Sequence, residues 1–406
     1  MRVFWVWVLL VAAAWAEPTR ITFWHAFSGE REVKLKSLIQ GFEKENPAIR
    51  VELRGFTDPR GVGNDYAELY RNLLRALDER KAPVVSLMYE NWVTQVADLK
   101  LLVALDEQMG NTWRDMPDIF LRASTHRNGK RYSVPFNKSL WTLYANRKML
   151  LGKEPPQNWT ELRQRCDALS AQYPGGVLGA PSPFELFSVH FVSQGGQFFN
   201  PQGLPAFAGP VGISSAGYLK SMVSPQPMCV FGSQAVQQFV QGKLPYLIDT
   251  SAKLSRFESG LGDDLQVLPL PRGAGDRIQL TGTQLSLFAQ SSPLERRCGL
   301  RLMRYLTAPE QTRQWAIATG YLPVRTSVYS DPVYIDYLQA RPGRTVISGG
   351  LSRAQVQPRM VGWEATRIII NDALERMLYQ SQTPQKELRG AQLTSGRLLR
   401  GLQGKQ

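Results

Sequence analysis

Two charged residues stand where their chemistry could serve a ligand. Arg367 opens the run Arg-Ile-Ile-Ile in an otherwise apolar, helical stretch. Its guanidinium carries five N–H donors in a planar fork and can bond an anion bidentately. Glu90 directly follows an apolar strand, and its carboxylate only accepts hydrogen bonds, which suits adjacent hydroxyls of a polyol. Together they describe a ligand with hydroxyls at one end and an anionic or strongly polar group at the other. The alternatives are a salt bridge for Arg367 and a solvated loop carboxylate for Glu90.

Residues that commonly carry catalysis are sparse. The three histidines are His25, His126 and His190, and none lies in a metal-binding or triad signature. No phosphate-cradling glycine loop is present. Paired carboxylates for glycoside hydrolysis are available, so a hydrolase remains an alternative. The sequence favours a non-enzymatic protein without a cofactor or metal.

Three cysteines, Cys166, Cys229 and Cys298, are widely separated along the chain. They have no metal-ligand spacing and allow at most one disulfide. A bridge between Cys229 and Cys298 is one interpretation, and buried free thiols are the preferred one.

The first sixteen residues predict export. Met1 and Arg2 give a short positive start, residues 3–16 are unbroken apolar sequence, and Ala14-Trp15-Ala16 fits the small-x-small pattern that signal peptidase reads. A membrane-spanning helix needs roughly 20 apolar residues, so the run favours a cleaved signal peptide, residues 1–16, over an uncleaved anchor. The mature chain is then expected to begin near Glu17.

Composition and charge suit an exported globular protein. The 406 residues are enough for two to three domains, and 43% hydrophobic residues can build sizeable cores. The 48 basic and 34 acidic residues give a net charge of +14. The basic residues are spread along the whole chain without a nucleic-acid-binding signature, so we expect no nucleic acid partner. We interpret most of the surplus as a solvated surface with a modest preference for anions.

Apolar periodicity alternates between strands and helices. Residues 21–24 form a short strand, residues 35–42 carry apolar side chains at helical spacing, and residues 49–53 alternate as a strand. A second helical stripe over 66–77 leads into the apolar strand 84–88. This order predicts an α/β fold with an open parallel sheet, in which ligands bind beyond the carboxyl ends of the strands. Later helices are expected from Trp159, from Pro309 to Gly320, and over 363–378.

Five short motifs carry a family resemblance. In chain order they are ITFWH at 21–25, FEKENP at 42–47, PFN at 135–137 with LYAN at 143–146, NWTEL at 158–162, and ATGYLPV at 318–324. In this order and at these intervals, the sequence resembles the family 1 extracellular solute-binding proteins of ABC importers. Within that family it is most similar to the branch that binds glycerol 3-phosphate, a relative of the maltose-binding branch.

The resemblance implies a type II periplasmic-binding-protein fold: two α/β lobes joined by a hinge, with a ligand cleft between them. The chain crosses between the lobes three times in such proteins, and we expect the crossings near Pro135, Gly282 and Pro323. Lobe one would hold residues 17–134 and 284–323, and lobe two residues 135–283 and 324–406. Rotation about the hinge would close the lobes around the ligand.

The resemblance also implies a set of ligand-binding residues. Matched position by position, they are Tyr66, Glu90, Ser139, Ser251, Gly282, Tyr321 and Arg367. The four hydroxyls would donate to phosphate or sugar oxygens, and Gly282 would let its backbone N–H approach the ligand closely. Arg367 matches the phosphate-holding arginine of the family. Each position except Arg367 and Glu90, treated above, also has an ordinary interpretation as a turn or core residue.

Aromatic residues near these positions widen the range of ligands. Trp92, Trp141 and Trp363 are close in sequence to matched residues, Lys138 precedes Ser139, and Phe184 occupies the region where the glycerol-phosphate branch has a tryptophan. Aromatic faces pack against sugar rings, so a cleft wall built from these residues would suit a sugar or glycoside, such as glucosylglycerol or a disaccharide. A role in the core is the other interpretation for each of them.

By resemblance, the chain is expected to be a monomeric periplasmic receptor. It would bind a small hydroxylated solute, sn-glycerol 3-phosphate or a related phosphodiester, and deliver it to the permease subunits of an ABC importer. A receptor for a sugar is the first alternative. A periplasmic sensor that presents its ligand to a signalling receptor would have the same fold.

Overall fold

The first strands and helices follow the apolar pattern of the sequence. α1 (Glu30–Glu45) and α2 (Tyr66–Asp78) each bury one apolar face. The strands β1 (Thr19–His25), β2 (Ile49–Gly55) and β3 (Val85–Met88) pair in parallel, with β1 in the middle. The predicted alternation of strands and helices is therefore confirmed over this part of the chain. The computed structural model describes residues 17–57, 66–150, 152 and 154–403, so the predicted signal peptide lies outside the described residues.

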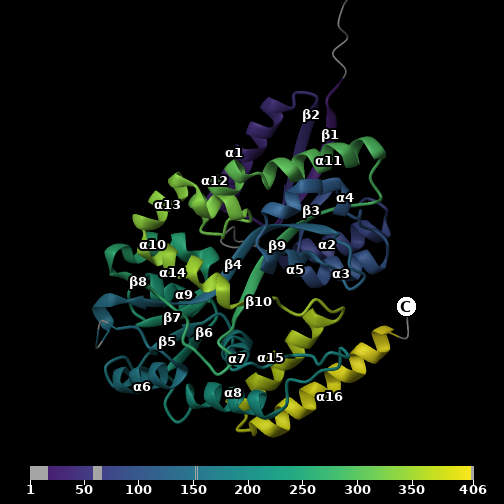
Figure 1. Cartoon of the computed structure of the whole chain (residues 1–406). Helices are drawn as coiled ribbons and strands as arrows, with labels where there is room; N and C mark the ends of the chain where they lie inside the picture. Colours follow the sequence, from purple (N-terminus) through teal and green to yellow (C-terminus); the bar gives the residue numbers. More distant parts are fainter. Residues whose placement is uncertain (1–16, 58–65, 151, 153, 404–406) are drawn as a thin grey trace, which may run out of the picture.

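The remaining strands extend this sheet through the whole molecule (Figure 1). They are β4 (Ser133–Asn146), β5 (Leu178–Ala180), β6 (Cys229–Phe231), β7 (Tyr246–Thr250), β8 (Leu265–Leu268), β9 (Ile278–Leu287) and β10 (Ala354–Gln355). The strand order is β2-β1-β3-β9-β4-β7-β5-β6, with β10 paired to β9 and β8 paired to β4. β9 runs antiparallel to both β3 and β4, so the sheet is mixed, whereas the pattern of the first strands predicts a parallel one.

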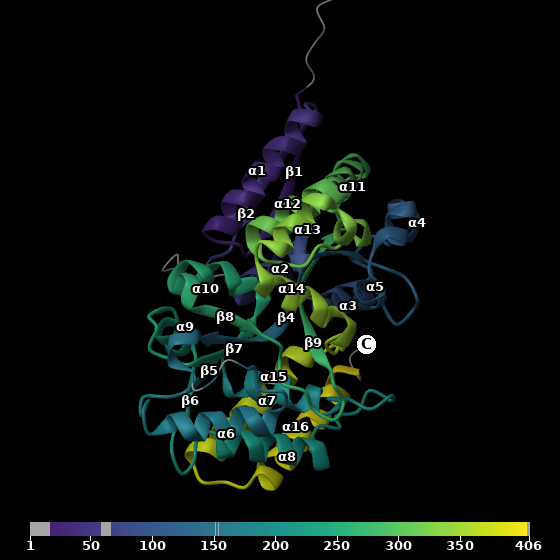
Figure 2. The same ribbon diagram turned by 60° about the vertical axis from the view of Figure 1, so that its left-hand side comes forward.

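Helices cover both ends of this sheet. Those that follow α2 are α3 (Glu90–Asp98), α4 (Asp106–Met109), α5 (Asp118–Ser124), α6 (Trp159–Ser170), α7 (Pro183–Ser193), α8 (Pro210–Ser221), α9 (Ser233–Val240), α10 (Leu254–Leu261), α11 (Pro293–Leu306), α12 (Pro309–Thr319), α13 (Pro332–Gln339), α14 (Pro342–Gly349), α15 (Trp363–Tyr379) and α16 (Pro384–Gln403). In Figures 1 and 2, α1, α11 and α12 lie at one end of the molecule and α6, α8 and α16 at the other, with β4 and β9 between them. The predicted helices at Trp159, Pro309 and Trp363 are confirmed, and Gly320 ends α12 in the left-handed conformation.

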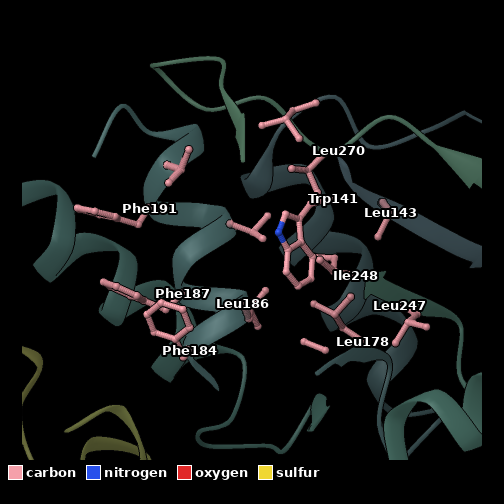
Figure 3. Close-up of a cluster of buried hydrophobic side chains, with 14 of the residues drawn as sticks. Trp141, Leu143, Leu178, Phe184, Leu186, Phe187, Phe191, Leu247, Ile248 and Leu270 are labelled. Carbon is pink, nitrogen blue, oxygen red and sulfur yellow. The ribbon is translucent and has the colours of Figure 1, made fainter. Parts of the chain in front are cut away.

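Two large hydrophobic cores lie on either side of the central strands. The first core contains the buried side chains of β1, β2 and β3 with those of α1, α2 and α11. The second core contains those of β5 and β7 with α6, α7, α15 and α16. Figure 3 shows part of the second core, where Phe187 and Phe191 of α7 and Leu247 and Ile248 of β7 lie on opposite sides of Trp141. Separate cores of this kind are the physical basis of two lobes.

The chain passes from one core to the other at three places that lie together. On β4, Phe136 packs in the first core and Leu140 in the second. Lys138, between them, pairs across the sheet with Gly282 of β9. The Lys138 carbonyl accepts a hydrogen bond of 2.7 Å from the N–H of Leu322, which follows the first-core residue Tyr321. All three connections therefore meet around Lys138.

The lobe boundaries themselves, 17–134 with 284–323 and 135–283 with 324–406, stay a prediction. One element departs from them: α5 lies within 17–134, but Ile119, Phe120 and Ala123 pack in the second core. Apolar spacing within a short helix does not say which of two cores the helix joins.

All three cysteines are free and buried. Cys166 and Cys229 lie in the second core and Cys298 in the first, so the alternative of a bridge between Cys229 and Cys298 is wrong. None of the helices in the described part of the chain combines the length and the apolarity of a membrane span.

Candidate functional site

A cavity of about 930 Å³ is lined by residues from both cores and from the connections between them. This volume lies near the top of the roughly 300–1,000 Å³ that is typical of small-molecule sites. Seven of the eleven residues predicted from the sequence line it: Tyr66, Ser139, Gly282, Tyr321 and Arg367, together with Phe184 and Trp141. The structure thus gathers side chains that are as many as 301 residues apart in the chain.

The wall on the side of the first core carries three tyrosines and an arginine. Tyr66 begins α2 and contacts Tyr89, which follows β3, with ring centroids 5.0 Å apart. Burial raises the pKa of Tyr66 and of Tyr89, so both hydroxyls stay protonated and can donate hydrogen bonds. Tyr321 stacks on Trp315, and its hydroxyl accepts a hydrogen bond of 3.5 Å from Nη1 of Arg31. This wall offers several donors to an oxygen-rich ligand.

The connections between the cores contribute Ser139 and Gly282. Gly282 has a φ of 116°, and a Cβ built there would lie 1.7 Å from the carbonyl oxygen of Asn137. A side chain at this position is therefore sterically excluded. Ser251 does not line the cavity: it is buried below its neighbours Thr250 and Ala252, and its Oγ accepts a hydrogen bond of 3.3 Å from the Leu140 N–H. In this geometry Ser251 fastens the chain after β7 to β4.

Arg367 enters the cavity from the first half of α15 and is bonded to two carboxylates. Nη2 donates to Oε1 of Glu185 at 2.6 Å, and Nη1 donates to both oxygens of Glu364 at 3.1 and 3.3 Å. The guanidinium carbon also lies 5.1 Å from the centroid of the Phe184 ring, a cation–π distance. Burial acts against the positive charge, but the two carboxylates outweigh it and raise the pKa of Arg367.

The charges that line the cavity balance. Four are positive, namely Arg31, Lys253, Arg256 and Arg367, and four are negative, namely Glu30, Glu185, Asp249 and Glu364. Asp249 accepts a hydrogen bond of 2.8 Å from Lys253. Burial raises the pKa of Glu185, and Arg367 offsets this only in part. The described lining therefore has no formal net charge, which disfavours a ligand with two uncompensated negative charges.

Glu90 has a different environment from the predicted one. It begins α3 and is buried, but its Oε1 accepts a hydrogen bond of 2.5 Å from Nζ of Lys138, and it does not line the cavity. Lys138 is fully buried, so its ammonium needs a carboxylate partner. The sequence places Lys138 beside Ser139 but does not reveal that its side chain engages Glu90.

The four aromatic residues proposed for the cleft wall divide evenly. Trp141 and Phe184 line the cavity. Trp92 lies in the first core and stacks on Tyr70 with ring centroids 4.4 Å apart. Trp363 lies in the second core against Phe198, at 4.8 Å. Trp92 and Trp363 therefore pack in the hydrophobic cores and do not line the cavity.

Several lining residues were missed from the sequence. Arg31 and Glu185 lie in the first turns of α1 and α7, and Asp249 is the last residue but one of β7. First turns commonly carry acidic or polar residues for capping reasons alone, so the residue types give no signal. Tyr89 could have been found, because it follows β3 at the same sheet edge as Glu90. Among the described residues, His, Cys, Asp and Glu side chains form no group suited to a metal ion.

The fold is that of solute-binding receptors. UgpB from Mycobacterium tuberculosis, solved in complex with glycerophosphocholine, superimposes with a TM-score of 0.85 at 23% identity, covering 96% of this chain and 99% of that one. The GacH receptor of Streptomyces glaucescens, solved unliganded and with acarbose, gives a TM-score of 0.82 at 20% identity, covering 95% and 99%. These likenesses show the type II periplasmic-binding-protein fold.

Sequence comparison leads to the family. The sn-glycerol-3-phosphate-binding periplasmic protein UgpB of Escherichia coli K12 is 24% identical over 418 residues, which cover 94% of this chain and 93% of that protein. The family model for the bacterial extracellular solute-binding proteins matches residues 37–342, more than half of the chain. The chain belongs to this family, whose members are solute-binding receptors of ABC importers and not enzymes.

Proposed function

We propose that this receptor works in the periplasm after removal of residues 1–16 and binds a small hydroxylated phosphate ester, either sn-glycerol 3-phosphate or a related phosphodiester. It then delivers this ligand to the permease subunits of its importer. The observation that carries the proposal is the guanidinium of Arg367 in a cavity whose walls also present tyrosine and serine hydroxyls.

The balance of charge favours a phosphodiester over a monoester. A phosphomonoester carries about −1.5 to −2 charges at pH 7, and Glu185 and Glu364 lie within hydrogen-bond distance of Arg367. A diester carries one negative charge, and a diester with a cationic head group has none overall. Such a ligand suits a lining of four positive and four negative residues. The glycerophosphocholine in the complex of the M. tuberculosis receptor is a molecule of this kind and supports the choice.

A neutral sugar or glycoside is the second candidate. Trp141 and Phe184 give the cavity aromatic surface, and its volume of about 930 Å³ exceeds what a glycerol phosphate fills. Receptors of similar fold have been solved with acarbose and with maltose. Carboxylates such as Asp249 would accept hydrogen bonds from sugar hydroxyls.

Titration calorimetry with glycerophosphocholine, sn-glycerol 3-phosphate, glucosylglycerol and maltose tests the ligand. We expect the tightest binding for glycerophosphocholine, and tight binding of maltose without binding of either phosphate compound would reject the proposal. We further expect Arg367→Lys to weaken glycerophosphocholine binding more than tenfold, about 1.4 kcal/mol, because an ammonium cannot replace the bidentate fork. Unchanged affinity would remove Arg367 from the site.

Delivery to an importer, as opposed to a sensor, is tested in cells. Deleting the gene should abolish uptake of the labelled ligand, and uptake should return with the intact gene. Normal uptake in the deletion strain, together with loss of a transcriptional response to the ligand, would favour the sensor.

A further inference from the structure

Arg31 gives the first-core wall of the cavity a cation that the family resemblance does not predict. It lies in the first turn of α1, lines the cavity and is partly buried. Its Nη1 donates to the Tyr321 hydroxyl at 3.5 Å. A long, charged side chain held at a cavity wall beside phenolic hydroxyls is placed to meet an anion.

Three tyrosines, Tyr66, Tyr89 and Tyr321, line the cavity together with this guanidinium. Burial acts against its charge, but Tyr321, Tyr66 and Tyr89 outweigh that effect and raise the pKa of Arg31. Arg31 therefore stays charged at any physiological pH. Tyr66 and Tyr321 line the same cavity, so their hydroxyls add neutral donors to the charged one.

Arg367 belongs to the opposite wall, where it is bonded to Glu185 and Glu364. Both guanidinium groups line the same cavity, and their helices, α1 and α15, pack in different cores.

We propose that Arg31, with Tyr66 and Tyr321, forms the first-core half of an anion-binding clamp whose second-core half is Arg367. The inference rests on the proposed function and adds a specificity-determining residue to it. An anion held between the two walls interacts with both cations only when the cores approach, so its binding stabilises the closed arrangement. Glu30, next to Arg31, disfavours a second negative charge at this wall, which selects a singly charged phosphodiester.

The test compares Arg31→Gln with Lys34→Gln, a matched control on the same helix. Lys34 bonds Gln314 at 2.9 Å and does not line the cavity. Calorimetry with glycerophosphocholine should show at least a tenfold loss of affinity for Arg31→Gln and a change of less than twofold for Lys34→Gln. Small-angle scattering with saturating ligand should show less compaction for Arg31→Gln than for the wild type.

Each outcome decides between the two proposals. Affinity of Arg31→Gln within twofold of the wild type would overturn the clamp and leave the proposed function intact. A wild-type protein that binds maltose and neither phosphate ester would overturn both. If Arg31→Gln unfolds in urea at a lower concentration than the wild type, Arg31→Lys replaces it: a loss of affinity of at least threefold is then expected, because an ammonium cannot replace the guanidinium fork, and wild-type affinity overturns the clamp.

Discussion

Arg367 lines the cavity as predicted and also forms the salt bridges that were the alternative interpretation of this residue. The sequence predicts a guanidinium at the site, and the structure adds that Glu185 and Glu364 are bonded to it. An incoming anion must therefore compete with carboxylates that are already in place. The affinity of the site then depends on the protonation of Glu185, because burial raises the pKa of that residue.

This competition predicts a pH dependence. As pH falls toward the raised pKa of Glu185, its carboxylate takes up a proton and releases Arg367, so affinity for glycerophosphocholine should rise between pH 7.5 and pH 5. The phosphodiester keeps its single negative charge over this range and adds no titration. Calorimetry in a series of buffers measures the trend. In Glu185→Gln the profile should be flat and the affinity at pH 7.5 higher, and a wild-type affinity that stays constant or falls would contradict the competition.

The candidate site was predictable where a residue type is rare in its surroundings. Arg367, an arginine in an apolar helix, is such a case, whereas Gly282 was assigned only by the family resemblance; both line the cavity. Glu90 also stood out in the sequence as a carboxylate directly after an apolar strand. Its partner Lys138 is 48 residues away in the chain, so the sequence did not reveal their ion pair. Arg31 and Glu185 look like ordinary residues of first helical turns. Only the fold brings them to the cavity, so sequence spacing could not identify them.

At the scale of elements, β4 and β9 are the strands that contribute side chains to both cores. β9 joins the sheet between β3 and β4, antiparallel to both, about 190 residues after β3 in the chain. The local pattern predicted β1, β2 and β3 with the helices between them, since each apolar face is visible within some 15 residues. The partner of β3 on its other side depends on a pairing that no local pattern encodes.

A substitution at Gly282 tests how closely the backbones of β4 and β9 approach each other. In Gly282→Ala the Cβ would lie 1.7 Å from the Asn137 carbonyl oxygen, and the φ of 116° is unfavourable for alanine. We expect the free energy of unfolding to fall by at least about 2 kcal/mol, measured by urea denaturation. Gly217→Ala in α8 is the control, because nothing lies within 4 Å of the added Cβ, and it should be neutral or slightly stabilising. Equal stabilities for the two variants would contradict the close approach of the strands.

At the scale of the whole molecule, each half holds a buried neutral histidine. His25 lies in β1, where it stacks on Phe27, and His190 lies in α7, where it stacks on Tyr218. Burial lowers the pKa of each from 6.5 to about 4. Acid should therefore lower the stability of both halves of the molecule.

The sign of this effect follows from which state binds the proton. Between pH 6.5 and about 4 the unfolded chain protonates both histidines and the folded protein does not, so unfolding becomes easier as pH falls. Each histidine contributes a loss of up to about 3 kcal/mol. Urea unfolding at pH 7 and pH 4.5 measures the total, and His190→Gln should show a smaller difference between the two. The same difference in that variant as in the wild type would show that His190 does not titrate this way.

The placement of β9 also has a consequence for the timing of synthesis. At about 5–20 residues per second, a growing chain needs roughly 10–40 s after completing β3 before residue 278 exists. During that interval β3 lacks its neighbour, and the first core lacks the side chains of α11 and α12. The second core waits longer still, until α15 and α16 have been made. An unfinished chain therefore cannot complete either core before β9 and the helices after it have been made, so both halves of the molecule reach their final packing late in synthesis.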